Sequence, residues 1–236
     1  MGMLFETRIK CSECPIRHRA VCARCDDDEL TRLETMKTYR SFQPGATIHW
    51  SGDDIDFVSS VVKGVATLSR TLEDGRKQVV GLLLPSDFIG RPGRKEIEFD
   101  VTATSEVVLC SFERKPFERL IEDTPHVAQR LMEMALDELD AARDWMLLLG
   151  RKTAREKIAT FLEMVARRTQ PDGTPESALE LPLTRDEIAN YLGLTLETVS
   201  RQLTRLKSEG VIRFTDRRRF EVLDHVALRA ASGDDA

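Results

Sequence analysis

Short apolar runs, separated by regularly spaced turn signals, fill the part of the chain between residues 42 and 112. The turn signals recur about every ten residues: Pro44-Gly45, Gly52-Asp53, Lys63-Gly64, Asp74-Gly75, Pro85-Ser86 and Pro92-Gly93. The apolar runs between them include residues 58–62, 65–68 and 79–84. Short strands at even spacing are typical of sandwiches and jelly rolls. The pattern therefore predicts a β-rich domain, with a short helix over 28–37 before it.

The period changes at Pro125, where a long helical pattern begins and continues to residue 149. Its apolar and small residues are spaced alternately by four and three: Ala128, Met132, Ala135, Leu139, Ala142, Met146 and Leu149. This heptad spacing keeps one stripe of the helix facing a partner. A stripe of this kind also suits a helix packed on its own domain. The small residues at alternate positions favour two closely approaching helices, so we predict a dimer interface at Met132, Ala135, Leu139, Ala142, Met146 and Leu149.

Residues 181–223 carry the start and stop signals of two helices joined by a tight turn. Thr184 and Glu187 form a capping-box pattern, Gly193 provides the turn, Thr195 caps a second helix and Gly210 ends it. The residues predicted to face inward are Ile188, Ala189, Leu192, Leu196, Val199, Leu203 and Leu206. A helix over 153–168 and a loop over 171–175 precede this unit, and residues 231–236 are predicted to be frayed.

The opposite face of the second helix has the side chains that bind bases. Arg201 suits the O6 and N7 of guanine, Glu197 suits a cytosine amino group, and Ser200 is adaptable. Thr195 or Thr198 at the helix start suits a phosphate. Two strands over 211–214 and 220–223, joined through Asp216-Arg217-Arg218-Arg219, predict a basic wing. Together these features predict a winged helix-turn-helix that binds double-stranded DNA.

Composition limits the other possibilities. A net charge of -5 excludes a general polycation, yet basic side chains outnumber acidic ones between residues 197 and 220. No apolar run approaches the roughly 18 residues of a membrane span, and residues 1–10 lack the apolar core of a secretory signal. We therefore expect a cytoplasmic protein without membrane contact. The chain has no catalytic triad, Walker loop or dinucleotide fingerprint, so we do not predict an enzyme.

The cysteines are concentrated near the N-terminus. Cys11, Cys14, Cys22 and Cys25 form a Cys-x2-Cys-x7-Cys-x2-Cys pattern, and Cys110 stands apart. In a reducing compartment such a pattern indicates metal or redox chemistry instead of disulfides. Four thiolates hold either zinc or a [4Fe–4S] cluster, and the spacing alone favours zinc slightly. By itself, Cys110 reads as a buried apolar residue at a strand end.

The segment 192–201, Leu-Gly-Leu-Thr-Leu-Glu-Thr-Val-Ser-Arg, resembles the recognition motif of the Crp/Fnr family of bacterial transcription regulators. Its Glu-x-x-Ser-Arg form resembles the oxygen-sensing FNR branch. The resemblance extends over nearly the whole chain and implies an α+β fold. That fold has a cysteine-rich arm over 1–27, a cyclic-nucleotide-binding-like β-roll (jelly roll) over 28–124, a dimerisation helix over 125–150 and a winged helix-turn-helix over 151–236.

The same resemblance implies how the protein works. An oxygen-labile [4Fe–4S] cluster would be held by Cys11, Cys14, Cys22 and Cys110, with Cys25 as the alternative to Cys22. The intact form would be a homodimer that binds a palindrome of the TTGAT-N4-ATCAA type through Glu197, Ser200 and Arg201 and contacts RNA polymerase, as a regulator of anaerobic gene expression. The alternative is a zinc-stabilised or cluster-free regulator of this family that answers to another signal. A cyclic-nucleotide activator is disfavoured, because no glutamate follows Gly90.

Overall fold

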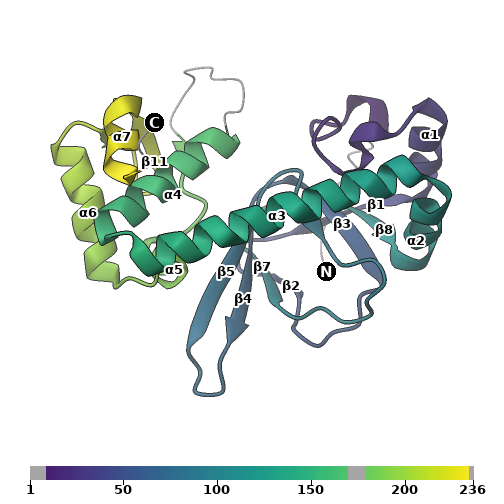
Figure 1. The fold of residues 1–236 in the computed structure, drawn as a ribbon, viewed down its shortest axis with the longest axis horizontal. Coiled ribbons are helices and arrows are strands. Elements are labelled where there is room, and N and C mark those ends of the chain that lie inside the picture. The colour runs from purple at the N-terminus through teal and green to yellow at the C-terminus, as the bar shows by residue number, and fades with distance from the viewer. Residues whose placement is uncertain (1–8, 170–178, 234–236) are drawn as a thin grey trace. The chain divides into compact units, whose positions relative to one another are not determined.

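The computed structural model describes residues 9–169 and 179–233 (Figure 1). The chain forms two compact units, residues 1–140 and 141–236, and the division falls inside one long helix, α3 (Pro125–Arg151). The sequence had predicted four segments, of which the long helix was one. The predicted loop over 171–175 lies outside the described residues.

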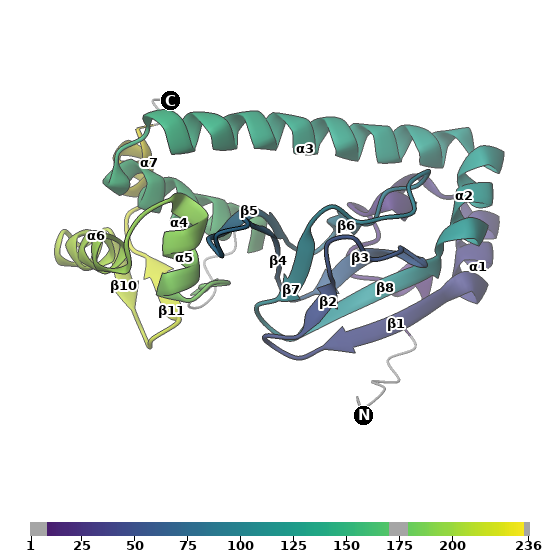
Figure 2. The same cartoon turned by 90° about the horizontal axis from the view of Figure 1, so that it is seen from below.

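The first unit is built on two four-stranded antiparallel sheets (Figure 2). One has the order β1-β8-β3-β6 and the other β2-β7-β4-β5. The strands are β1 (Lys37–Phe42), β2 (Thr47–His49), β3 (Phe57–Lys63), β4 (Ala66–Thr71), β5 (Lys77–Leu83), β6 (Phe88–Ile89), β7 (Asp100–Ala103) and β8 (Val107–Glu113). The β-rich domain predicted from the turn spacing is confirmed.

Two groups of buried side chains lie in this unit, because alternate residues of a strand face opposite sides of a sheet. Val61 and Leu109 belong to the core between the strands of the β-roll. Val58, Cys110 and Phe112 belong to the other core, which the N-terminal arm and the helices cover. The helices here are α1 (Asp27–Met36) and α2 (Arg114–Asp123), and the arm itself forms two short 3-10 turns, η1 (Cys11–Glu13) and η2 (Val21–Arg24).

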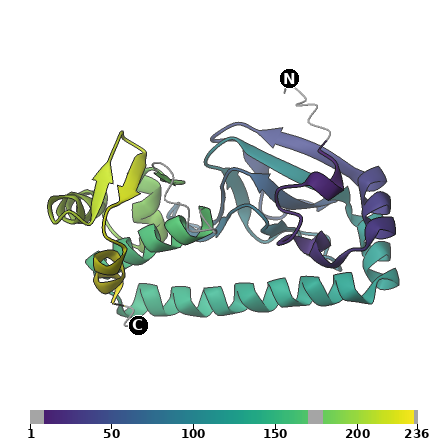
Figure 3. The same cartoon turned by 90° about the horizontal axis from the view of Figure 1, so that it is seen from above.

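Helix α3 confirms the predicted long helix and runs two residues beyond the predicted end. It lies beside the N-terminal arm in the first unit, as the purple and teal segments of Figure 3 show. None of the helices in the described ranges is both long enough and apolar enough to cross a membrane.

The second unit contains α4 (Ala154–Thr169), α5 (Arg185–Leu192), α6 (Leu196–Ser208) and α7 (His225–Ser232). A sheet of order β10-β11-β9 joins β10 (Ile212–Phe214), β11 (Arg219–Val222) and β9 (Leu179–Glu180). The predicted two-stranded wing thus has a third strand. Residues Ala231 and Ser232 are buried at the end of α7, so the prediction of fraying from residue 231 is wrong there.

The capping pattern that predicted α5 and α6 is present as hydrogen bonds. The Thr184 hydroxyl accepts from the Glu187 amide at 3.2 Å, and the Glu187 carboxylate accepts from the Thr184 amide at 2.7 Å. Gly193 ends α5 in the left-handed region at φ 62°, which glycine adopts without strain. The Thr195 hydroxyl then accepts from the Thr198 amide at the start of α6. The turn between the two helices is therefore fixed by local sequence.

Candidate functional sites

The thiols of Cys11, Cys14, Cys22 and Cys110 lie, with that of Cys25, in one packed group of side chains of the first unit. Burial raises the pKa of Cys110 well above its usual range, and the thiols of Cys11, Cys14 and Cys22 raise it further. Burial likewise raises the pKa of Cys22 to about 11, with further contributions from Cys14 and Cys11. The tertiary fold therefore brings three arm thiols close to the strand thiol that is far from them in sequence. These are the four residues predicted to hold a cluster.

Cys25 has different surroundings. Burial raises its pKa to about 12, followed by the charges of Cys22, Glu29 and Asp26, with Arg17 acting in the opposite direction. The thiol with the largest effect on Cys25 is Cys22, whereas the leading charges acting on Cys110 are those of the other three arm thiols. The environment of Cys25 is thus the start of α1 and not the strand thiol.

Two cations shape the arm around these thiols. The guanidinium of Arg17 donates to the carbonyl oxygens of Cys22, Ala23 and Cys25, each at 2.9 Å. The ammonium of Lys37 donates to the carbonyl of Ile9 at 2.5 Å and to the Cys11 sulfur at 3.4 Å. Neither residue was predicted from the sequence, because an isolated basic side chain carries no local sign of its buried partners.

The arm is also attached to α3. The guanidinium of Arg24 pairs with Glu133 at 2.7 Å, and Arg130 donates to the carbonyl of Arg19 at 2.6 Å. Nearby, the carboxylate of Glu29 lies 2.7 Å from the imidazole of His126. Arm and α1 therefore contact α3 at its first turn and again near residues 130–133, within one compact unit.

Within residues 9–169 and 179–233, no three His, Cys, Asp or Glu side chains are arranged to bind a single metal ion. A [4Fe–4S] cluster is held by four thiolates, and four thiols are grouped here around Cys110. Ser60 is buried directly opposite Cys110, and its hydroxyl has no hydrogen-bond partner. A sulfur-rich donor set beside an unpartnered hydroxyl fits a sulfide-containing group.

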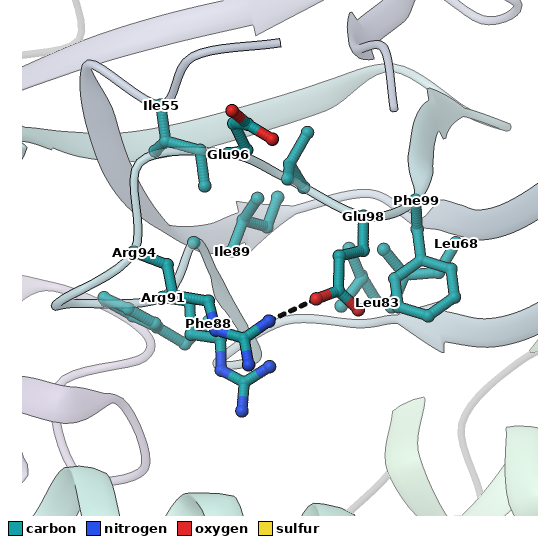
Figure 4. A pocket seen from close by; sticks show the side chains of 12 residues that line it. Ile55, Leu68, Leu83, Phe88, Ile89, Arg91, Arg94, Glu96, Glu98 and Phe99 are labelled. Atoms are coloured by element: carbon teal, nitrogen blue, oxygen red, sulfur yellow. Dashed lines mark hydrogen bonds and ion pairs between the residues drawn. The ribbon is translucent and has the colours of Figure 1, made fainter. Parts of the chain in front are cut away.

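The β-roll also holds a cavity of about 150 Å³ (Figure 4). Its lining is mostly apolar, with Ile55, Leu83, Phe88 and Ile89 among the contributors. Arg91 and Arg94 lie side by side, and Arg94 is paired with Glu98 (Figure 4). Arg91 occupies the position after Gly90 at which a cyclic-nucleotide cassette needs a glutamate, so the structure gives this cavity no acidic group at that place.

The recognition surface is formed by α6. Glu197, Arg201 and Thr204 are exposed, and Ser200 is half-buried and accepts from the guanidinium of Arg185 at 3.4 Å. Thr195 is exposed and Thr198 is half-buried, both at the first turn. The backbone of Glu197 and then the Thr195 side chain hold the pKa of Glu197 below its usual value. The base-binding groups predicted from the sequence therefore share one accessible face.

One predicted inward residue of this helix is exposed. Leu196 has 43% of its surface accessible, whereas Val199, Leu203 and Leu206 are buried as predicted. A helical side chain leans toward the turn before it, and Leu196 is the first residue of α6. No preceding turn is available to cover it, so this apolar side chain joins the recognition surface.

The wing arginines have distinct roles. Asp216 accepts from the amides of Arg218 and Arg219, both at 2.7 Å, and so fixes the turn between β10 and β11. Arg213 pairs across the strands with Glu221. Arg217 is exposed at the tip of the turn. The tip therefore presents positive charge of the kind that binds a DNA backbone.

The predicted seam on α3 is largely uncovered within the chain. The accessible fractions are 58% at Met132, 45% at Leu139 and 74% at Met146, and Ala135 and Ala142 are also exposed. Leu136 and Leu147, which lie beside the seam, are exposed as well. Leu149 differs because it is half-buried in its own unit. Such a stripe of exposed apolar side chains is characteristic of an interaction surface.

Comparison with known proteins agrees with this architecture. Residues 39–124 match the cyclic nucleotide-binding domain, and residues 156–231 match the Crp-like helix-turn-helix domain. The chain is 61% identical over 231 residues to the transcriptional activator protein FnrL of Cereibacter sphaeroides, covering 96% of this chain and 93% of that protein. It is 41% identical over 207 residues to the nitrogen fixation regulation protein FixK of Bradyrhizobium diazoefficiens, covering 86% and 85%.

Among solved structures, FixK2 from Bradyrhizobium japonicum is similar, with a TM-score of 0.78 and 32% identity. The match covers 85% of this chain and 99% of that one. The fold and these matches define a DNA-binding transcription regulator. The chain belongs to the Crp/Fnr family, in the group that contains the FNR and FixK proteins. The predicted family and fold class are thus confirmed, and so is the prediction that the chain is not an enzyme.

Proposed function

We propose that the protein is an oxygen-responsive transcription regulator whose sensor is a [4Fe–4S] cluster held by Cys11, Cys14, Cys22 and Cys110. The observation that carries the proposal is the packing of the arm thiols and Cys110 in one cluster of side chains, in which Cys11, Cys14 and Cys22 act electrostatically on the thiol of Cys110. A zinc site closed by the four arm thiols would instead require Cys25 to share the surroundings of Cys11 and Cys14. The neighbours of Cys25 favour the set that includes Cys110.

When bound, the cluster would supply an oxygen-labile bond between the arm and the β-roll. The residues around the thiols connect this bond to the dimer helix α3. Cys110 is on β8 of the rigid sheet, whereas the other three thiols are on short turns of the arm. Arg24 and the Arg19 carbonyl connect the same arm to α3 near the exposed seam. The position of the arm is therefore able to influence the surface that meets a second copy of the chain.

The seam of α3 supports a homodimer, and two recognition helices would then bind the two halves of a palindrome. The base-binding set Glu197, Ser200 and Arg201 suits half-sites of the TTGAT type, with Thr195 and Thr198 on phosphates. Like FnrL, which is named as a transcriptional activator, the regulator would act as an activator of anaerobic genes by contacting RNA polymerase. This role places it in the cytoplasm.

Purification without air tests the proposal directly. The wild-type protein is expected to contain iron and acid-labile sulfide, to absorb broadly in the visible range, and to bleach when air is admitted. Cys110→Ser is expected to lose the iron and the anoxic binding to a TTGAT-N4-ATCAA duplex.

Two results would overturn the proposal. The first is a colourless wild-type protein that contains zinc, which would favour the zinc-stabilised alternative. The second is a Cys110→Ser variant with the same iron content and DNA affinity as the wild type.

A further inference from the structure

Ser60 is an unusual residue on the thiol side of the β-roll. It lies on β3 between the buried residues Val58 and Val62, directly across from Cys110 on β8, and is 2% exposed. Residues directly opposite in an antiparallel pair place their side chains on the same face. Its hydroxyl nevertheless has no hydrogen-bond partner. A buried hydroxyl without a partner destabilises the fold, and at this position, opposite Cys110, it is available to donate to a group held by the thiols.

Lys37 is a second buried polar residue, on β1, the strand that pairs with β8 on the side opposite to β3. Its side chain is only 8% exposed, and its carboxylate neighbour, Glu34, is 4.0 Å away and itself 43% exposed. The ammonium donates to the Cys11 sulfur and the Ile9 carbonyl. It also lies 5.5 Å from the centre of the Tyr39 ring. These contacts leave the buried positive charge without a close anion, so an anionic group beside it would be favourable. The thiols of Cys11 and Cys110 are the groups on which its charge acts.

We propose that Lys37 and Ser60 are positioning residues that retain the bound cluster, Lys37 by offsetting its negative charge and Ser60 by donating a hydrogen bond to its sulfur. This inference rests on the proposed function, because it needs an anionic, sulfur-rich group between the arm and β8. The two residues approach that place from different elements, Lys37 from the start of β1 and Ser60 from the middle of β3.

The proposal has a consequence of opposite sign in the two states of the protein. Without the cluster, Ser60 leaves a buried hydroxyl unsatisfied and Lys37 a buried charge without a close anion, so removing either group leaves the stability unchanged or raises it. With the cluster, removal takes away a hydrogen bond or a compensating charge. Partners of this kind commonly change the affinity of a metal site about tenfold to a hundredfold. A residue with a merely structural role would weaken both states together.

The experiment compares Ser60→Ala and Lys37→Met with the wild type, each purified without air. The first measurement is the rate at which visible absorption is lost at a fixed oxygen concentration, together with iron and sulfide content. The second is urea unfolding of the cluster-free chain. We expect the loss of absorption to be about tenfold faster in both variants, with unfolding midpoints equal to or above that of the wild type.

Matched controls separate this effect from general consequences of mutation. Ser69 is also buried, at 0% exposed, with an unpartnered hydroxyl, but it lies on β4 of the other sheet. Ser69→Ala should reproduce the effect of Ser60→Ala on the cluster-free chain and leave the bleaching rate unchanged. Lys157, buried in the second unit, provides the same control for Lys37 through Lys157→Met. Lys37→Arg, which keeps the charge, should restore much of the wild-type lifetime.

The outcomes distinguish the two proposals. If the wild-type protein holds no iron and sulfide, the proposed function fails and this inference fails with it. If the wild type holds the cluster and both variants bleach at the wild-type rate, the inference alone is overturned. It is also overturned if the variants lose cluster and cluster-free stability in parallel, since that result marks a packing role.

Discussion

The recognition helix and the thiol site are built in different ways from the same chain. Every group predicted to bind bases lies within the short capped segment from Thr184 to Ser208, and its geometry is set by local hydrogen bonds. The thiol site instead joins an N-terminal arm to a strand that follows it by about a hundred residues, and depends on the packing of the whole first unit. We therefore expect the loss of a single ligand cysteine to abolish the thiol site. Single substitutions in the recognition helix should instead reduce DNA affinity by limited amounts.

The largest expected effect separates two neighbouring cysteines. Cys22→Ser should abolish the iron content of anaerobically purified protein, because Cys22 is electrostatically coupled to Cys14 and Cys11. Cys25→Ser should retain the iron, since Cys25 has Glu29 and Asp26 near it instead. Iron and sulfide analysis measures both. If Cys25 is the ligand instead of Cys22, the Cys25→Ser variant will lose its iron and the Cys22→Ser variant will keep it.

A second, large effect is expected at the seam of α3, which is contiguous in sequence but is completed only by another copy of the chain. Leu139→Asp would place a charge in the proposed interface and should shift the anoxic protein from dimer to monomer. Asp137→Lys, a charge change at an exposed residue on the opposite face of α3 from the seam, is the control and should leave the dimer intact. Analytical ultracentrifugation without air measures the two. Equal dimer fractions in all three proteins would contradict the proposed interface.

An intermediate effect is expected at Arg201, the central base-binding group of the contiguous site. Arg201→Ala should remove about 1–3 kcal/mol of discrimination between TTGAT half-sites and half-sites in which the guanine is replaced. Arg217→Ala should weaken binding to both duplexes equally, because an exposed wing arginine suits phosphates. Fluorescence anisotropy at a fixed salt concentration provides the comparison. Loss of discrimination in the Arg217 variant alone would reverse these assignments.

The smallest expected effect concerns the local hydrogen bonds that shape the DNA site. Thr184→Ala removes the hydroxyl that accepts from the Glu187 amide, and should lower the free energy of unfolding of the second unit by about 1 kcal/mol. Thr31→Ala, at an exposed threonine inside α1, is the control and should change stability less. Urea unfolding followed by tryptophan fluorescence suits this test, since Trp145 stacks on Tyr191 of α5. No difference between the variants would show that the cap contributes little.

The contrast between the two sites also explains what the sequence could predict. Caps, a turn glycine and heptad spacing are local signals, so α3, α5 and α6 and the exposed face of α6 were predicted correctly. The prediction that Leu196 faces inward was wrong, because periodicity takes no account of where a helix begins. The strand β9 has two residues, too few for a period, and was missed. The helix α7 was also missed, although Asp224 caps its start and Gly233 ends it. The grouping of Cys110 with arm thiols came from family resemblance, since no local pattern relates them, and the burial of Lys37 and Ser60 depends entirely on tertiary packing.

The N-terminal arm is attached to the same part of α3 that carries the exposed seam. Arg130 and Glu133, which bind the arm, lie two residues before and one residue after Met132 of the seam. The residues that bind the arm and a residue of the proposed dimer interface thus lie in a single helical turn, so a change in the arm can reach the interface directly. A genetic screen would therefore find constitutive and unresponsive alleles intermingled along the same few codons of this helix, instead of sorted into separate segments of the gene.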